Sequence, residues 1–351
     1  MSSTEIRVAL IGFGLGGAFF HAPLIAAAKG MRLAAIVTGN AERQAQALRD
    51  YPGVRVLADP EALWREAADY DLAVISTPNR SHVPLALAAL GAGLPVVIDK
   101  PFATSTVEAR RVIAAAREKK LALSAYHIRR WDSECLTLRG LMEQGTLGRV
   151  LRFESRMERW RPAPKGGWKE RGVTEEGGGL LYDIGSHLID QALYLFGPAR
   201  DVYAELDIRR ADVDSDDDVF LALSHESGVR SHLWASVMAA TPGARMRVMG
   251  TAGAYAKQRG DVQEAALRAG ARPATPGWGE DPSENWGVIS DGVRSQAVES
   301  VRGSYQSFYS GMASALRDDT AVPVDPEDAV TGLKIIEAAR RSAAERVVIK
   351  L

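Results

Sequence analysis

The chain has 351 residues, of which 46% are hydrophobic and 25% charged, a globular composition with more chain than one core usually holds. Its 43 basic and 44 acidic side chains leave a formal net charge of −1, so no broad charge field attracts nucleic acid or an anionic membrane. The single cysteine, Cys135, excludes an intramolecular disulfide and lacks the neighbours of a zinc site. We therefore expect a cytoplasmic protein of two domains that handles a small molecule.

The first 125 residues alternate short apolar runs with helical patterns, as a doubly wound parallel sheet requires. Asn40 and Asp59 each precede a helical pattern and are expected to cap it, as is Thr104 or Ser105. Strands are expected at Arg7–Ile11, Arg32–Val37, Val54–Leu57, Leu72–Ser76, Pro95–Ile98 and Leu121–Ala125.

From residue 126 the pattern changes to longer alternating segments, which are typical of half-buried antiparallel strands. We expect 126–351 to form an α+β domain with a large open, mostly antiparallel sheet, interrupted by a helix from Leu180 to Phe196. This domain would bind substrate and form a homodimer or homotetramer through the sheet's outer face. A last helical pattern, 326–345, is expected to pack back on the first domain. The clearest strands are Val150–Met157, Val219–Ser224 and Ser231–Met238, the last offering Leu233, Ala235 and Val237 to a subunit partner.

A glycine signature follows the first predicted strand. Gly12, Gly14 and Gly17 have the G-x-G-x-x-G spacing directly before a helical pattern. The first glycine permits a tight turn, the second lets backbone approach a pyrophosphate, and the third allows close packing of helix on strand. The helix N-terminus then receives the anion. The pattern predicts a Rossmann domain at residues 1–125 that binds a dinucleotide, in preference to a merely structural glycine turn.

The end of the second strand indicates which dinucleotide is bound. NAD enzymes usually place a carboxylate there to bond the ribose hydroxyls. Here Thr38 and Asn40 offer neutral hydrogen bonds, and no acidic residue lies between the end of the strand and Glu42. Arg43 could reach a 2′-phosphate. We therefore expect NADP(H) to be favoured over NAD(H), although Arg43 also fits an ordinary solvated helix position.

Polar residues follow the fourth and fifth strands, at the carboxyl ends where doubly wound sheets bind ligands. A lysine there can donate to a reacting oxygen and stabilise a developing alkoxide, although Lys100 alone would also fit an ordinary surface lysine. The residues expected to bind the cofactor are Gly12, Gly14, Leu15, Gly17, Thr38, Asn40, Arg43, Thr77, Pro78, Asn79, His82, Asp99 and Lys100.

Three glycines, 177–179, introduce the helix that carries Asp183 and His187. On an α-helix these two residues are i and i+4, so they share a face. A carboxylate there can orient the imidazole and stabilise its cation, so His187 can take or give a proton near neutral pH. A buried histidine tied to an aspartate for structure explains the pair equally well.

Taken together and in order, the glycine loop, Thr77-Pro78-Asn79, Asp99-Lys100-Pro101 and the segment 178–187 resemble the Gfo/Idh/MocA dehydrogenases over essentially the whole chain. The resemblance implies that Lys100, Asp183 and His187 are catalytic and that the Lys100–Pro101 bond is cis, as is frequent in the family. It also implies hydride transfer between a nicotinamide and a secondary alcohol or ketone of a cyclic polyol or sugar.

Three further segments, 20–25, 126–132 and 266–270, resemble the subgroup of NADP-dependent scyllo-inositol dehydrogenases, which implies an inositol-like substrate. The chain departs from the pattern at three places. Asp99 stands where Glu is usual, Ile128 where Asn is common, and Gly39-Asn40 where the NADP enzymes often have Ser-Arg.

Aromatic faces pack on sugar-like rings and arginine guanidinium groups donate hydrogen bonds to their hydroxyls, although tryptophan is also an ordinary core residue. The candidates for substrate binding are His127, Arg129, Trp131, Trp160, Arg161, Trp168 and Tyr182. The acidic run of Asp214, Asp216, Asp217 and Asp218 lacks the spacing of a calcium loop, so we interpret it as a solvated strand entry and expect no metal.

Two other functions fit the same motifs. A glycosidase could use transient oxidation by a tightly bound NAD, in which case turnover would leave no net reduced cofactor. A dinucleotide-binding sensor without catalysis is the third candidate, because fold does not fix function. A sensor would have no need of the Asp183 and His187 pair.

Overall fold

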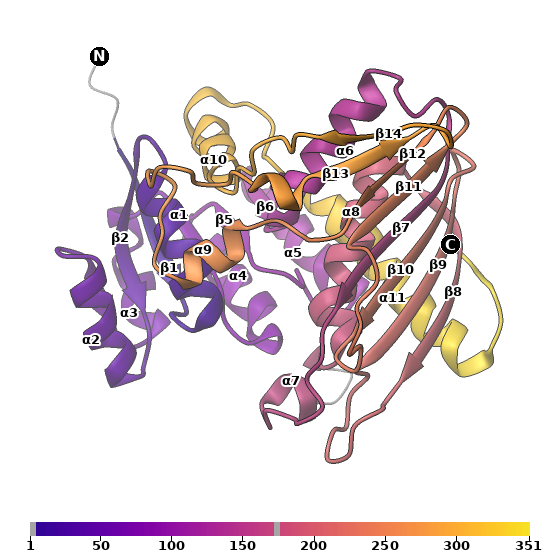
Figure 1. The fold of residues 1–351 in the computed structure, drawn as a ribbon. Coiled ribbons are helices and arrows are strands. Elements are labelled where there is room, and N and C mark those ends of the chain that lie inside the picture. Colours follow the sequence, from indigo (N-terminus) through magenta and orange to yellow (C-terminus); the bar gives the residue numbers. More distant parts are fainter. Residues whose placement is uncertain (1–4, 172–175) are drawn as a thin grey trace. The chain divides into compact units, whose positions relative to one another are not determined.

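The computed structural model describes residues 5–171 and 176–351, except for the side chains of Trp168 and Lys169, and these residues group into two compact units (Figure 1). Unit 1 comprises Met1–Ile128, Gln263–Trp278 and Tyr305–Val330, and unit 2 comprises Arg129–Val262, Gly279–Ser304 and Thr331–Leu351. The sequence-based division cuts the chain once after residue 125, whereas these units exchange segments repeatedly.

Unit 1 contains a six-stranded sheet in the order β3-β2-β1-β4-β5-β6. Every pairing is parallel, so the prediction of a doubly wound Rossmann sheet is confirmed. The strand order reverses between β1 and β4, which is the point where such sheets bind ligands. The strands are β1 Ile6–Ile11, β2 Met31–Val37, β3 Arg55–Leu57, β4 Leu72–Ile75, β5 Val96–Ile98 and β6 Leu123–Ala125.

The helices of unit 1 begin where the sequence places side-chain caps. Asn40 accepts from Arg43 N at 3.0 Å, and Asp59 accepts from Ala62 N at 2.8 Å. Ser105, rather than Thr104, caps the next long helix. The helices are α1 Ala22–Ala27, α2 Ala41–Asp50, α3 Pro60–Arg65, α4 His82–Gly91, α5 Thr106–Lys119, α9 Gln263–Arg268 and α10 Gln306–Asp318, with short turns η1 Gly16–His21, η2 Ala67–Asp69 and η3 Asn79–Ser81.

Unit 2 is built on a nine-stranded sheet in the order β14-β13-β12-β11-β7-β10-β9-β8-β15. Only β7 and β10 pair in parallel, so the expected open, mostly antiparallel sheet is confirmed. Its strands are β7 Val150–Glu158, β8 Ala199–Asp207, β9 Asp218–His225, β10 Arg230–Ser236, β11 Met246–Gly250, β12 Ala254–Lys257, β13 Gly287–Ser290, β14 Ser295–Val298 and β15 Ile349–Lys350.

Helices α8 and α11 lie on one face of this sheet (Figure 1). α11 is divided between the units, because Pro326–Val330 group with unit 1 and the residues from Thr331 onward group with unit 2, and its expected packing on the first domain stays a prediction. In unit 2, Ala204 N of β8 donates to Ser342 Oγ at 2.9 Å. The helices that lie wholly or mostly in this unit are α6 Ser133–Glu143, α7 Trp168–Arg171, α8 Ser186–Phe196 and α11 Pro326–Glu345, with turns η4 Ile128–Trp131, η6 Leu181–Gly185 and η7 Ser283–Asn285. In the described ranges, none of the helices has both the length and the apolar character needed to cross a membrane.

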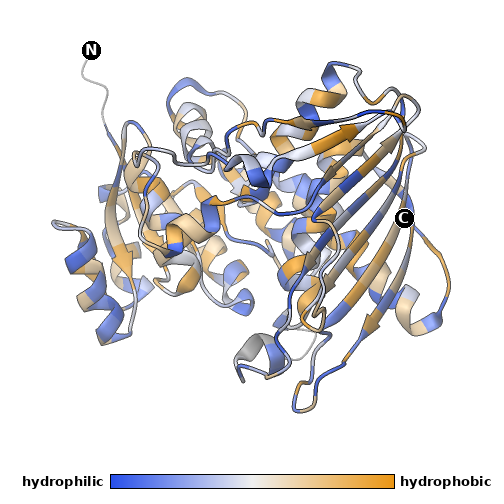
Figure 2. Ribbon diagram, viewed as in Figure 1, coloured by the Kyte–Doolittle hydropathy of each residue, from blue (hydrophilic) through white to orange (hydrophobic). Residues whose placement is uncertain are grey.

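Hydrophobic and hydrophilic residues alternate along strands of the nine-stranded sheet (Figure 2). The face of β10 that was expected to meet a subunit partner is the wrong one. Leu233 and Ala235 are fully buried inside the unit, and Val237 is buried as well. The uncovered face instead carries His232 and Trp234.

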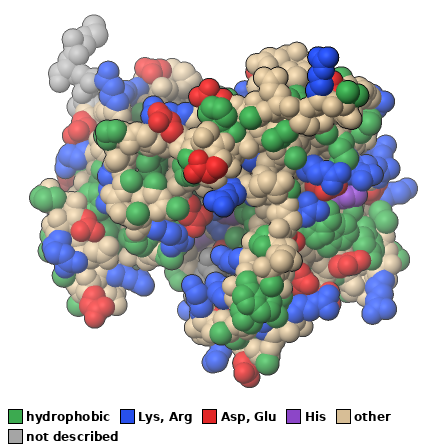
Figure 3. All heavy atoms as spheres, in the orientation of Figure 1, with side chains coloured by type: hydrophobic (Ala, Val, Ile, Leu, Met, Phe, Trp, Pro, Cys, Tyr) green, Lys and Arg blue, Asp and Glu red, His purple; other side chains and the backbone are tan. Residues whose placement is uncertain are grey.

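The uncovered face has a stacked cluster at its centre. The guanidinium of Arg156 lies 3.8 Å from the Trp234 ring centroid, a cation–π distance. The Phe220 and Trp234 rings are 5.2 Å apart. On the side that helices α8 and α11 do not cover, hydrophobic, basic and acidic side chains are interspersed (Figure 3). Aromatic rings and arginine are enriched at protein interfaces.

We predict that this face joins copies of the chain into a homo-oligomer, and that Trp234→Glu shifts the oligomer toward monomer because the new carboxylate would have to be buried. Light scattering at micromolar concentration measures the mass. Val107→Glu, at a 68% exposed position of α5, is the matched control and should not change the mass. A wild-type protein that is monomeric at this concentration would contradict the prediction.

Candidate active site

The loop after β1 needs glycines because neighbouring backbone occupies the space of a side chain. Gly12 has φ of 98°, and a Cβ there would lie 2.2 Å from the carbonyl oxygen of Ser76. A Cβ on Gly17 would lie 2.0 Å from the carbonyl oxygen of Gly12. At Gly14, by contrast, the nearest atom is 3.7 Å away. The loop is therefore packed tightly against the end of β4, while the space beside Gly14 is open. This arrangement fits a loop whose backbone binds a pyrophosphate.

A helix follows the glycine loop, as the pattern predicted. Its first turn, η1, is a π-helical turn that leads into α1. The helix that carries Asp183 begins in the same way, with η6 before α8. π turns are rare and are found frequently at functional sites.

Among the described residues, Arg43 is the only charged side chain within 4 Å of the Cβ position of Gly14, and its Nη1 is the nearest atom. It belongs to the first turn of α2, which Asn40 caps. The Asn40 side chain is thus used for capping, and the Thr38 carbonyl accepts from Gln44 Nε2 at 2.8 Å. Arg43 is exposed, but it lies beside the glycine loop, as a phosphate-binding residue would.

His82 links the two polar turns at the carboxyl ends of β4 and β5. Its Nδ1 lies 2.9 Å from the Pro101 carbonyl oxygen, and its Nε2 lies 2.9 Å from that of Thr77. Burial lowers the pKa of His82, against the opposing charge of Asp99. The Lys100–Pro101 bond is cis, as the resemblance implied. Since both ring nitrogens of His82 face main-chain carbonyls, its predicted contact with the cofactor stays a prediction.

The Asp99 carboxylate accepts hydrogen bonds from two groups at the carboxyl ends of β4 and β5. Oδ1 accepts from Lys100 N at 2.8 Å, and Oδ2 accepts from Ser76 Oγ at 2.8 Å. Oδ2 also lies 3.2 Å from Nε2 of His21. Burial alone would raise the pKa of Asp99, but the His21 and Lys100 charges and the hydrogen bonds outweigh it and hold that pKa well below its usual range. Neither His21 nor Ser76 was expected at this site from the sequence motifs.

In unit 2, the helix with Asp183 and His187 begins against a buried carboxylate. Asp216 accepts from Leu181 N at 2.6 Å through Oδ2. A Cβ on Gly179 would lie 2.2 Å from Asp216 Oδ1, so a side chain cannot fit there. Burial raises the pKa of Asp216, against the hydrogen bond from Leu181 N. The glycines before the helix therefore make room for its capping acid.

The acidic run after residue 213 is not the solvated strand entry that we expected. Asp216 is used as described above, and Asp217 is buried and accepts from Arg210 Nε at 2.8 Å. Within the residues that the structure describes, no group of His, Cys, Asp or Glu side chains is arranged to hold a metal.

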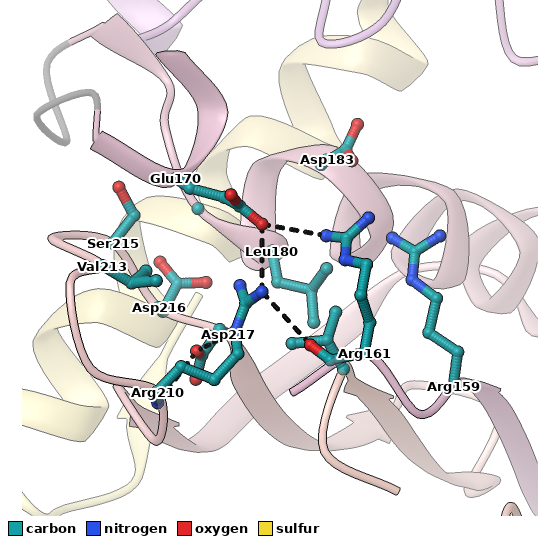
Figure 4. Close-up of a pocket in the computed structure, with 12 residues that line it drawn as sticks. Arg159, Arg161, Glu170, Leu180, Asp183, Arg210, Val213, Ser215, Asp216 and Asp217 are labelled. Atoms are coloured by element: carbon teal, nitrogen blue, oxygen red, sulfur yellow. Dashed lines mark hydrogen bonds and ion pairs between the residues drawn. The ribbon is translucent and has the colours of Figure 1, made fainter. Parts of the chain in front are cut away.

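Asp183 lines a pocket together with Arg159 and Arg161. Figure 4 shows the Asp183 carboxylate above the two guanidinium groups. The floor is an ion network in which Glu170 accepts from Arg161 Nη2 at 3.1 Å and from Arg210 Nη1 at 3.0 Å. Burial opposes ionisation of Glu170, but hydrogen bonds from Gly166 N and Arg210 lower its pKa. The pocket is thus lined by a carboxylate, which accepts hydrogen bonds from hydroxyls, and by guanidinium groups, which donate hydrogen bonds to them.

Of the other substrate candidates, those whose side chains the structure describes do not line this pocket. Tyr182 is buried under Arg340, whose guanidinium lies 5.3 Å from the ring centroid. Trp160 is 55% exposed and pairs with Met238. His127 belongs to unit 1, whereas Arg129 and Trp131 belong to unit 2. The side chain of Trp168 lies outside the described part, and the roles of all six stay predictions.

We predict that Gly17→Ala destabilises the protein by about 1–3 kcal/mol and weakens dinucleotide binding, because its methyl group would overlap the Gly12 carbonyl. Thermal unfolding and fluorescence titration with a reduced nicotinamide dinucleotide measure the two effects. Gly91→Ala is the control, because no atom of the described residues lies within 4 Å of a Cβ there. It should stabilise α4 slightly and leave binding unchanged. Equal melting temperatures for the two variants would refute the steric argument.

Comparisons with known proteins cover nearly the whole chain. Residues 6–127 match the family model "Oxidoreductase family, NAD-binding Rossmann fold", and residues 139–351 match "Oxidoreductase family, C-terminal alpha/beta domain". The uncharacterized oxidoreductase YdgJ of Escherichia coli strain K12 is 38% identical over 99% of each chain. The scyllo-inositol 2-dehydrogenase (NADP(+)) IolW of Bacillus subtilis strain 168 is 33% identical over 99% of this chain and 96% of its own. The solved structure of YvaA from Bacillus subtilis superposes with a TM-score of 0.94 at 32% identity, covering 100% of this chain and 99% of that one. The chain therefore belongs to the Gfo/Idh/MocA family of oxidoreductases.

Proposed function

We propose that this oxidoreductase transfers hydride between NADP(H) and a secondary alcohol or ketone of a cyclic polyol or sugar, with an inositol-like ring as the leading substrate. The observation that carries the proposal is the start of the helix in unit 2. There Asp183 lines a pocket beside Arg159 and Arg161, and His187 follows four residues later. The similarity to IolW, whose name specifies NADP and scyllo-inositol, supports the same substrate class.

His187 is the proton-transfer group of the proposal, because an imidazole titrates near neutral pH. In the oxidative direction it takes the proton of the substrate hydroxyl, and in the reductive direction it returns that proton. Asp183 orients the imidazole and stabilises its cation. Lys100 donates a hydrogen bond to the oxygen that develops negative charge. The nicotinamide ring supplies the hydride-accepting carbon when it is bound.

NADP(H) is preferred in this proposal because β2 ends without a carboxylate and Arg43 lies beside Gly14. A guanidinium there stabilises a 2′-phosphate through charge-assisted hydrogen bonds. A carboxylate on the ribose hydroxyls, which NAD enzymes use, has no counterpart at Thr38–Asn40.

We expect Arg43→Ala to weaken NADPH binding about 10- to 100-fold, the usual worth of a hydrogen bond to a charged group, while NADH binding stays the same. Fluorescence titration of both dinucleotides measures the two Kd values. Arg49→Ala, at the other end of α2, is the matched control. An equal loss for NADPH and NADH, or tighter binding of NADH by the wild type, would remove the 2′-phosphate assignment.

The substrate class is tested by following reduced nicotinamide absorbance with a panel of inositols and aldoses in both directions. Oxidation of a polyol, or reduction of its ketone, supports the proposal. Glycosides belong in the panel, because cleavage of a glycoside without net cofactor reduction identifies the transient-oxidation glycosidase instead. Binding of a dinucleotide with no turnover of any panel member favours the sensor.

With the substrate in hand, His187→Ala should lower kcat by about 10²–10⁴-fold and leave NADPH affinity nearly unchanged. Lys100→Ala should cost a comparable factor through lost stabilisation of the oxyanion. Since both residues are proposed to serve one transfer, the double variant should lose less than the product of the single losses. Near-normal turnover by His187→Ala would overturn the proposed mechanism.

A further inference from the structure

Unit 1 contains a series of polar contacts between side chains that ends at the backbone of Lys100. The hydroxyl of Tyr309, from α10, lies 2.6 Å from Nδ1 of His21. Nε2 of His21 lies 3.2 Å from Oδ2 of Asp99, and Asp99 Oδ1 accepts from the backbone N–H of Lys100 at 2.8 Å. His21 and Tyr309 are both fully buried. Burying a polar group lowers the stability of the fold unless the group is bonded. This series of contacts is therefore expected to have a functional or a structural role.

The surroundings of His21 fix its ring. The Tyr126 ring lies against it, with centroids 4.0 Å apart and planes inclined by 34°. Tyr126 in turn donates from its hydroxyl to the Phe20 carbonyl. Burial raises the pKa values of Tyr126 and Tyr309 well above the ordinary value, so both rings stay neutral. The other titratable groups that act on His21 are Asp99 and His82.

The two nitrogens of the His21 ring face different partners. Nδ1 lies at hydrogen-bond distance from the Tyr309 hydroxyl. Nε2 is buried and has no aligned hydrogen bond among the described residues, and Asp99 Oδ2, 3.2 Å away, is the carboxylate oxygen that faces it. Since Lys100 N bonds the other oxygen of the same carboxylate, the imidazole and the Lys100 peptide meet Asp99 at separate oxygens.

The glycine loop meets the same carboxylate. A Cβ on Gly16 would lie 2.9 Å from Asp99 Oδ2 and 2.5 Å from Ser76 Oγ. Asp99 is therefore contacted by the first turn of the cofactor-binding helix, by the end of β4, by His21 and by the peptide of Lys100. A carboxylate held by this many partners fixes the main chain that carries the Lys100 side chain.

From this geometry we propose that His21 is a positioning residue for Lys100, acting through Asp99 and supported by Tyr309. The proposal rests on the catalytic role of Lys100 proposed above. His21 touches no reacting atom in it. Its part is to keep the Asp99 carboxylate in place, so that the Lys100 main chain, and with it the direction of the ammonium group, stays fixed.

The first experiment requires no substrate. Trinitrobenzenesulfonate labels free lysine amines, and peptide mass spectrometry gives the labelling rate of each lysine across a pH series. His21→Gln and Tyr309→Phe should change the rate at Lys100 by at least about threefold, the effect of half a unit in the lysine pKa. The rate at exposed Lys119 of α5 should stay the same.

The second experiment uses turnover. His21→Gln should lower kcat about 10- to 100-fold with little change in NADPH affinity, as expected when a reacting group is displaced by a fraction of an ångström to 1 Å. Tyr309→Phe should lower kcat in the same direction by less. The loss in the His21→Gln/Asp99→Asn double variant should fall short of the product of the single losses, because both act through one contact.

A matched control separates positioning from general stability. His225 is also a buried histidine, bonded to the Gly197 carbonyl at 2.7 Å and to Ser231 Oγ at 2.8 Å in unit 2. His225→Gln should lower the melting temperature but leave kcat and Lys100 labelling at wild-type values. If His21→Gln does not fold, Tyr309→Phe, which removes one hydroxyl, carries the test alone.

Unchanged Lys100 labelling in His21→Gln and Tyr309→Phe would overturn the positioning role. Altered labelling in a protein that turns over no panel substrate would support the positioning role and refute the proposed function. Altered labelling with wild-type kcat in the same variants would show that the position of Lys100 does not govern the reaction and would overturn the inference.

Discussion

The close approach of backbone to backbone at the end of β1 is the constraint on which the cofactor site depends. Carbonyl oxygens of Ser76 and Gly12 occupy the places where Cβ atoms of Gly12 and Gly17 would lie. Because of this packing, the turn η1 lies close to the end of β4, and Gly16 lies against the Asp99 carboxylate. The glycine loop, the polar ends of β4 and β5, and the peptide of Lys100 are thereby built around one set of contacts.

The two units start their functional helices in the same physical way. In each, a glycine without room for a side chain lies against a buried carboxylate, Asp99 at Gly16 and Asp216 at Gly179. In each, the first turn is π-helical before the α-helix proper begins. At Gly179 the acid meets the helix start directly, because Asp216 accepts from Leu181 N, and such a charge is stabilised by the orphan N–H groups and the helix dipole. Asp99 instead bonds Ser76 Oγ and Lys100 N, so at Gly16 the missing side chain makes room for the carboxylate without a helix cap.

The sequence predicted the features that depend on neighbours along the chain. The parallel strands, the Asn40 and Asp59 caps and the glycine loop are local patterns, and the structure contains them. The bond between His21 and Tyr309 joins residues 288 positions apart, and no periodicity indicates such a partner. Similarly, the alternation in β10 revealed two faces but not which one the helices cover, so Leu233 was assigned to the wrong side. The pairing of Asp217 with Arg210 was missed because a run of acids predicts solvation when its counter-ions are not considered.

The exchange of segments between the units has a consequence for how the chain acquires its structure. Unit 1 is completed only when α10 and the segment after it have been synthesised, because Ser124 Oγ donates to the Val324 carbonyl at 2.8 Å and Tyr309 closes on His21. Loop closure over such separations costs entropy that must be recovered by native contacts. A fragment that ends after β6 would lack both partners, so the buried polar groups of Ser124 and His21 meet their native bonding partners only after residue 324 has been synthesised.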